Sequence, residues 1–140
     1  MILVDSSIWI DHLRAGEPAL AELLHAGRVL AHPFVVGELA CGNLKNRKEV
    51  LSLLQDLPAA PVATDEEVLF FIERRGLMGK GIGYVDAHLL AAISVTGSGR
   101  LWTRDKRLGG VAGSIGLAFK TASSSRGASR PKKSKPAATI

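Results

Sequence analysis

The sequence predicts an α/β domain built on a parallel sheet, and two similar segments carry most of that prediction. Ile2-Leu3-Val4 is a run of branched apolar residues that ends abruptly in Asp5 and two serines, which is typical of a strand buried on both faces that opens into a helix. Arg100-Leu101-Trp102-Thr103 repeats this pattern late in the chain and is followed by Arg104 and Asp105. In open parallel sheets, ligand-binding and catalytic residues lie beyond the carboxyl ends of the strands.

The composition indicates one compact domain. The chain has 140 residues and is 46% hydrophobic, which suffices for one core and is too little for two domains of ordinary size. Its single cysteine, Cys41, excludes an internal disulfide and fits a reducing cytoplasm. No basic segment precedes the first apolar run, and no apolar run approaches the length of a membrane span. We therefore expect a cytoplasmic protein with no signal peptide and no contact with a membrane.

The positive charge is concentrated at one end of the chain. Of the 18 basic residues, five lie in residues 121–140 without any acidic residue, which leaves residues 1–120 with 13 basic and 13 acidic side chains. We expect residues 1–120 to form the folded domain. Residues 121–140, rich in Ser, Ala, Pro and Gly, should be a basic disordered tail. Such a tail serves either as a solvated appendage or as an electrostatic arm for nucleic acid.

Two helices and a strand are expected after the first strand. A helix over residues 6–13 turns Ile8 and Trp9 inward, and its Asp11 lies three residues before Arg14, the spacing of a surface ion pair. A second helix over residues 18–25 starts with a proline and is followed by Gly27. Residues 28–31 are expected to form a second strand.

The next helix carries a carboxylate in an otherwise apolar sequence. It covers residues 34–41, and none of the helical neighbours of Glu38 can pair with a negative charge. Burial of an unpaired carboxylate costs several kcal/mol, on the order given for uncompensated charge. Glu38 is therefore either buried and compensated by another group, or it lies on an exposed edge of the helix.

The middle of the chain predicts two further helices with a short strand between them. Residues 47–57 show an amphipathic helical pattern, and residues 60–63 are a candidate strand. Thr64 and Glu67 have the spacing of a capping box for a helix over residues 66–75, which explains the three consecutive acids there structurally.

A glycine-rich loop and an apolar helix follow. The loop over residues 79–83 lacks the spacing of a phosphate-binding loop or a dinucleotide fingerprint. The helix over residues 84–93 is almost wholly apolar, so it should lie in the interior, with Asp86 in its first turn as either a cap or a functional acid. His88 does not share the face of Asp86, and we interpret it as a structural histidine or one at the rim of the site.

The last part of the folded region is expected to be less regular. Asp105 either caps a short helix or serves a site at the end of the late strand. Residues 109–116 are interpreted as a glycine-rich connection, and residues 115–119 as the last strand.

Four carboxylates lack a sufficient structural explanation: Asp5, Glu38, Asp86 and Asp105. An α/β fold can bring them to one edge of its sheet. Like charges about 4 Å apart repel by roughly 4 kcal/mol at an effective dielectric constant of ~20, so such a cluster needs protons or a divalent cation. Mg²⁺ or Mn²⁺ fits best, because the chain has neither a cysteine set nor a His pair at zinc spacing.

These residues carry a resemblance to a known family. Ile-Leu-Val-Asp-Ser-Ser at the start, Gly-Glu-Leu around Glu38, Val-Asp-Ala around Asp86 and Thr-Arg-Asp at 103–105 resemble, in order and spacing, the PIN-domain ribonucleases, and specifically the VapC toxins of prokaryotic toxin-antitoxin pairs. The resemblance covers residues 1 to about 120 and does not extend to the basic tail.

The resemblance implies a PIN-like three-layer α/β fold, with a parallel sheet of about four or five strands and helices on both faces. It also implies metal-dependent endoribonuclease activity, a homodimer, and inhibition by a cognate antitoxin protein. Asp5 and Asp86 would be the principal metal ligands, and Glu38 and Asp105 would complete the catalytic acidic site directly or through water. Thr103 and Ser6 match the hydroxyl residues that the family places beside its acids.

Two other functions remain open at this stage. A haloacid-dehalogenase-like phosphatase also begins with an apolar strand ending in Asp, but it needs a second Asp two residues later, where this chain has Ser7. A receiver-like signalling domain is less well supported, because the acidic pair of an earlier loop is missing. In a non-catalytic RNA-binding module, the tail would bind RNA and the acids would only cap helices.

Overall fold

The computed structural model describes residues 1–121, and the expected basic tail therefore lies almost entirely outside the described residues. Three parallel strands form the centre: β1 (Ile2–Val4), β2 (Val29–Leu30) and β3 (Arg100–Trp102), in the order β2-β1-β3. Leu3 of β1 lies opposite Leu30 on one side and Leu101 on the other. All of β1 is buried, as its uninterrupted apolar sequence predicts for a central parallel strand.

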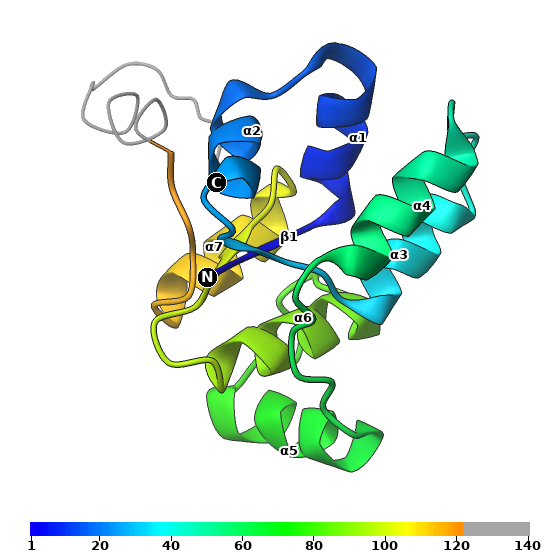
Figure 1. The fold of residues 1–140 in the computed structure, drawn as a ribbon. Helices are drawn as coiled ribbons and strands as arrows, with labels where there is room; N and C mark the ends of the chain where they lie inside the picture. The colour runs from blue at the N-terminus through cyan, green and yellow to red at the C-terminus, as the bar shows by residue number, and fades with distance from the viewer. Residues whose placement is uncertain (122–140) are drawn as a thin grey trace.

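Seven helices surround the sheet within the described residues. Figure 1 shows α1 and α2 on one side of the strands and α5 and α6 on the other, which confirms the three-layer α/β arrangement. None of these helices is both long and apolar enough to cross a membrane. The helices are α1 (Ser6–Ala15), α2 (Pro18–His25), α3 (Pro33–Ala40), α4 (Arg47–Asp56), α5 (Asp65–Arg75), α6 (Tyr84–Ser94) and α7 (Lys106–Ser114).

The sheet has fewer strands than expected. Single bridges extend it at both edges, between Ala31 and Ala59 and between Leu101 and Ala118, where four or five full strands were predicted. No strand forms at residues 60–63, where one was predicted, and the pairing in this part of the described chain is the single bridge at Ala59, one residue earlier. Prolines at 58 and 61 flank this bridge and lack the N–H groups that a longer ladder would need. The strand predicted at residues 115–119 is likewise reduced to the bridge at Ala118.

The prediction of a glycine-rich connection over residues 109–116 was wrong. Helix α7 runs through Gly109, Gly110 and Gly113 and ends at Ser114. Leu108, Val111 and Ala112 are buried, with Leu108 and Ala112 completely so. Glycines weaken a helix by about 1 kcal/mol each relative to alanine. Here the burial of the apolar face outweighs that cost, which local composition alone does not reveal.

Helix α6 is the most buried helix of the domain, as predicted. Every residue from Ala87 to Ile93 is buried, so the position of its first turn is fixed by the core. Helix α5 also contacts the first turn of α6, because Asp65 Oδ1 in α5 accepts a hydrogen bond from the Tyr84 hydroxyl at 2.9 Å. The predicted capping box at the start of α5 is confirmed, with reciprocal hydrogen bonds between Thr64 and Glu67.

The loop between α5 and α6 follows the start of α7 closely. Gly81 has a φ of +82°, and a Cβ atom at this position would lie 2.7 Å from Cδ of Arg107. A side chain at position 81 would have to displace Arg107, whereas a Cβ atom at Gly79 would meet no atom within 4 Å. The absence of a side chain at Gly81 therefore lets the loop and α7 approach each other.

Candidate active site

Asp5 lies at the carboxyl end of β1, where the strand turns into α1. Its side chain is buried at 7% exposure, and Oδ2 accepts hydrogen bonds from Thr103 Oγ1 at 2.7 Å and from Ser7 Oγ at 2.9 Å. The backbone N–H of Asp5 donates to the carbonyl of Trp102 at 3.0 Å. Asp5 stands at the N-cap position of α1 but makes no side-chain capping bond. Its carboxylate is thus held by the hydroxyl groups of two segments that meet at the sheet edge.

Glu38 is exposed, so the first of the two alternatives, a buried carboxylate, is wrong. Helix α3 turns Val35 and Leu39 inward and leaves Gly37 and Glu38 on an outer edge. Glu38 Oε1 accepts a hydrogen bond from Ser6 Oγ at 3.0 Å, which directs the side chain toward the start of α1. Glu38 therefore reaches the region of Asp5 from a neighbouring helix without the cost of burial.

Asp86 lies in the first turn of α6 and is half-buried. Its Oδ2 accepts a hydrogen bond from the backbone N–H of Gly83 at 3.2 Å. Burial raises the pKa of Asp86 above its usual range, the Gly83 N–H opposes this, and the negative charges of Asp5, Asp105 and Glu38 raise it further. All four candidate acids consequently share one electrostatic neighbourhood.

Asp105 follows β3 and is the N-cap of α7. Its Oδ1 accepts a hydrogen bond from the backbone N–H of Leu108 at 2.9 Å, and its own N–H donates to Thr103 Oγ1 at 3.0 Å. The capping role considered for this residue is therefore real, but it occupies only one oxygen of an exposed side chain. Thr103 joins Asp105 to Asp5 because its hydroxyl bonds to both residues.

The four acids share a further property. Each has one carboxylate oxygen held by a protein donor and one oxygen without a hydrogen bond from any of residues 1–121. The unbonded oxygens are Asp5 Oδ1, Glu38 Oε2, Asp86 Oδ1 and Asp105 Oδ2. Four oriented oxygen donors, whose charges raise one another's energy, have the chemistry that Mg²⁺ or Mn²⁺ requires.

The acids do not form a closed metal cage. Within residues 1–121, no three side chains of the metal-binding types are close enough together to hold one ion as they stand. Mg²⁺ commonly uses one or two protein carboxylates and takes its remaining ligands from water and substrate phosphates. The residues present therefore fit a divalent cation bound in an open site.

Two contributors to the site were not identified from the sequence. The resemblance pointed to Ser6 as the hydroxyl that follows the first acid, but Ser7 bonds to Asp5 whereas Ser6 bonds to Glu38. No role was predicted for Arg104, which lies between Thr103 and Asp105, yet its backbone N–H donates to Ser7 Oγ at 3.0 Å. The two consecutive serines after Asp5 were the available signal for the contact between Ser7 and Asp5. Nothing in the sequence indicated the contact between the Arg104 backbone and Ser7.

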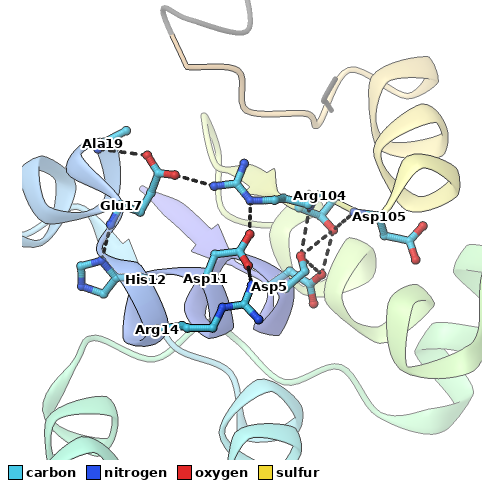
Figure 2. Close-up of polar contacts among 10 residues, drawn as sticks. Asp5, Asp11, His12, Arg14, Glu17, Ala19, Arg104 and Asp105 are labelled. Carbon is cyan, nitrogen blue, oxygen red and sulfur yellow. Dashed lines mark hydrogen bonds and ion pairs between the residues drawn. The ribbon is translucent and has the colours of Figure 1, made fainter. Parts of the chain in front are cut away.

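Figure 2 shows a set of charged side chains beside the acids, on the α1 side of the sheet edge. The predicted pair of Asp11 and Arg14 is confirmed at 3.1 Å. Asp11 also accepts from Nε of Arg104 at 2.6 Å, and Nη2 of Arg104 donates to Glu17 at the start of α2. Arg104 thus contacts both α1 and α2 through its side chain.

His88 has the structural role that its sequence position suggested. It is 2% exposed, lies between the rings of Phe34 and Tyr84, and contacts Asp65 Oδ1 through Nε2 at 3.2 Å. These contacts tie α3 and α5 to α6. His88 therefore supports the first turn of α6 from the side of the helix that does not carry Asp86.

Comparisons with known proteins agree with this arrangement. The family model of the PIN domain matches residues 2–114, a range that contains all four acids. Two curated proteins named Ribonuclease VapC32, from Mycobacterium tuberculosis strains CDC 1551 / Oshkosh and ATCC 25618 / H37Rv, are each 50% identical to this chain over 119 residues. The matching segment covers 85% of this chain and 96% of each relative.

Proposed function

Because this chain belongs to the PIN-domain family, we propose that it is a divalent-metal-dependent endoribonuclease and the toxin of a toxin-antitoxin pair. The observation that carries the proposal is the raised pKa of Asp86: burial raises it most, and the negative charges of Asp5, Asp105 and Glu38 raise it further. A protein that only needed helix caps would gain nothing from this repulsion. A site that binds a cation offsets the repulsion when the cation is present.

Asp5 and Asp86 are the proposed principal ligands of Mg²⁺, with Mn²⁺ as a substitute. Asp5 is the most buried of the four acids, and Asp86 has the raised pKa, so both gain most from a neighbouring positive charge. The exposed Glu38 and Asp105 are proposed to complete the catalytic site directly or through water. Oxygen donors of this kind suit hard cations.

The protein's own contribution to the chemistry is to orient the acids. Thr103 and Ser7 fix Oδ2 of Asp5 and leave Oδ1 without a hydrogen bond from residues 1–121, and Ser6 fixes one oxygen of Glu38 in the same way. The free oxygens of Glu38 and Asp105 can accept hydrogen bonds from a water molecule and align it with the RNA phosphodiester. A bound cation would supply neutralisation of the phosphate charge and a lower pKa for the attacking water.

The partners follow from the same proposal. The relatives are named ribonucleases, and we propose that RNA is the substrate here as well, with a cognate antitoxin protein as inhibitor and a homodimer as the assembly. We propose that the nuclease domain spans residues 1–120 and acts in the cytoplasm, with residues 121–140 as a basic tail. The five basic side chains of the tail would attract RNA phosphates, whereas the domain itself has a formal charge of zero.

The alternatives fit the contacts less well. In a phosphatase of the haloacid dehalogenase type, residue 7 would be a general acid, but the Ser7 hydroxyl donates to Asp5. In an RNA-binding module whose acids only cap helices, Asp5 and Glu38 would bond to backbone N–H groups. Neither does within the described residues, since both accept from serine or threonine hydroxyls.

A cleavage assay tests the proposal. Purified protein should cut single-stranded RNA in Mg²⁺ or Mn²⁺ and lose activity in a chelator. Asp5→Asn should lower the rate by about 100-fold or more, the loss typical of removing a group essential to catalysis. Asp56→Asn replaces an exposed acid at the end of α4 and serves as the matched control. Cleavage that is insensitive to chelator, or equal loss in both variants, would contradict the proposal.

A stability measurement tests the metal site without RNA. Mg²⁺ or Mn²⁺ should raise the melting temperature of the wild type, because a ligand that binds only the folded state stabilises it, and Asp5→Asn with Asp86→Asn should abolish this response. A raised pKa in the fold means that ionised Asp86 destabilises the metal-free protein at neutral pH. Asp86→Asn alone should therefore raise the metal-free melting temperature at neutral pH, and the gain should shrink as the pH falls through the raised pKa of Asp86 and vanish below the unfolded value of 3.8.

A further inference from the structure

We propose that Arg104 is a positioning residue that fixes the segment 103–105 against α1 and α2 and thereby sets the placement of Asp5 and Asp105. The inference rests on the proposed nuclease function and extends it to a residue outside the acidic cluster. Arg104 is the second residue after β3 and stands between two residues that contact the site, Thr103 and Asp105. Its side chain points away from the acids, toward α1 and α2 (Figure 2).

The side chain of Arg104 joins three parts of the chain. Nε donates to Asp11 Oδ2 of α1 at 2.6 Å, and Nη2 donates to Glu17 Oε2 at the N-cap of α2. The other oxygen of Glu17 accepts from the backbone N–H of Ala19 at 3.4 Å, so this carboxylate is itself fixed at the start of the helix. A planar guanidinium with two carboxylate partners restricts the orientation of the residue that carries it.

The backbone of the same residue connects to the acids. The N–H of Arg104 donates to Ser7 Oγ at 3.0 Å, and Ser7 Oγ donates to Asp5 Oδ2 at 2.9 Å. On either side of Arg104, Thr103 donates to the same oxygen of Asp5, and the N–H of Asp105 donates to Thr103. A shift of Arg104 relative to α1 would therefore change the hydrogen bonds of Asp5 and the direction of Asp105 together.

Exposure indicates that this role concerns geometry more than global stability. The side chains of Arg104, Asp11 and Glu17 are 40%, 36% and 23% exposed, and ion pairs in contact with water contribute little to the free energy of unfolding. A misplacement of about 1 Å in a catalytic site, in contrast, can cost about 100-fold in rate. Loss of the Arg104 side chain should thus affect turnover and metal binding much more than the melting temperature.

The test compares Arg104→Ala and Arg104→Lys with Arg14→Ala. Arg14 pairs with the same Asp11 but makes no hydrogen bond or ion pair with residues 103–105, which makes it the matched control. Arg104→Ala should lower kcat by about 10-fold to 100-fold at an unchanged KM for RNA. It should also raise the Mn²⁺ concentration that gives half of the maximal thermal stabilisation. Arg104→Lys should retain part of both properties, and Arg14→Ala should match the wild type.

A second variant approaches the same contacts from the other side. Asp11→Asn with Glu17→Gln leaves Arg104 in place and removes the charges of its partners, so it should reproduce the effects of Arg104→Ala. Adding Arg104→Ala to that background should then produce little further loss, because coupled residues are not additive. This variant also decides the question if Arg104→Ala alone fails to fold.

One measurement requires neither RNA nor metal. The backbone N–H of Asp105 is bonded to Thr103, and its hydrogen exchange should accelerate in Arg104→Ala but not in Arg14→Ala. Unchanged exchange, or a rise in KM at unchanged kcat that would mark Arg104 as an RNA contact, would overturn the inference. Failure of the proposed function would appear differently, as a wild-type protein that does not cleave RNA in metal or an active Asp5→Asn variant.

Discussion

His32 caps helix α3, and it should make the protein lose stability in mild acid. The side chain is 1% exposed, and its Nδ1 accepts a hydrogen bond from the backbone N–H of Phe34 at 3.0 Å. A ring nitrogen that accepts is unprotonated, so the neutral ring carries its hydrogen on Nε2, which has no hydrogen-bond partner within residues 1–121. Protonation of His32 would replace the capping acceptor by a donor that faces another donor.

The size of the effect follows from the pKa. Burial, and then the neighbouring His88, lower the pKa of His32 from 6.5 to about 4. Because the folded-state pKa is depressed, the stabilisation is complete above pH 6.5 and is lost progressively as the pH falls from 6.5 to about 4. One pKa unit corresponds to about 1.4 kcal/mol, so the loss is about 2 kcal/mol at pH 5 and about 3 kcal/mol at pH 4.

Urea unfolding at about pH 7.5 and about pH 5, in metal-free buffer, measures this loss. His32→Asn is the informative variant, because asparagine retains an oxygen that can cap α3 and does not titrate. The wild type should lose about 2 kcal/mol more than His32→Asn between the two pH values. His25→Asn, at the exposed end of α2, controls for replacing a histidine as such. The same pH dependence in the wild type and in His32→Asn would refute the assignment.

Three further predictions concern the site and the tail. Thr103→Val removes the shorter of the two hydroxyl bonds to Asp5, so it should lower the free energy of unfolding by about 1.5–3 kcal/mol and weaken Mn²⁺ binding in a titration followed by melting temperature. An unchanged Mn²⁺ response would separate that hydroxyl from the metal site. Glu38→Gln should remove most cleavage activity and leave the melting temperature equal or higher, because Glu38 belongs to the group of four acids. Glu67→Gln should cost a fraction of a kcal/mol in cap stability and leave activity unchanged. Equal activity losses in the two variants would contradict this assignment. A chain that ends at Lys120 should keep metal-dependent turnover at saturating RNA but bind RNA more weakly at low salt. The slope of log affinity against log salt should fall by about 0.7 to 0.9 for each lost phosphate contact. An unchanged slope would mean that the tail does not contact RNA.

The elements that could be predicted are those whose signal is local. An apolar run that ends in Asp5 needs no partner to be recognised as a buried strand, and the capping box at Thr64 is confined to four residues. Helix α7 shows the opposite case. Its glycines indicated a connection, and only the packing of Leu108 and Ala112 into the core makes the segment helical.

The acids were predictable as a set, whereas their individual environments were not. A carboxylate in an apolar helix suggested that Glu38 is buried, but whether a helix exposes one edge depends on what packs against it. The contacts of Arg104 with Asp11 and Glu17 join residues 93 and 87 positions apart. No periodicity or motif encodes such pairings, and they appear only when β3 is placed beside β1.

The approach of Gly81 to Arg107 bears on how the protein tolerates change. Gly79 and Gly81 look interchangeable in the sequence, and both have positive φ angles. Position 79 faces open space, so the protein should tolerate Gly79→Asn, because asparagine can adopt the left-handed conformation. At position 81 a Cβ atom would also have to displace the exposed side chain of Arg107, the second residue of α7. A substitution in this loop is therefore better tolerated at residue 79, as asparagine, than at residue 81.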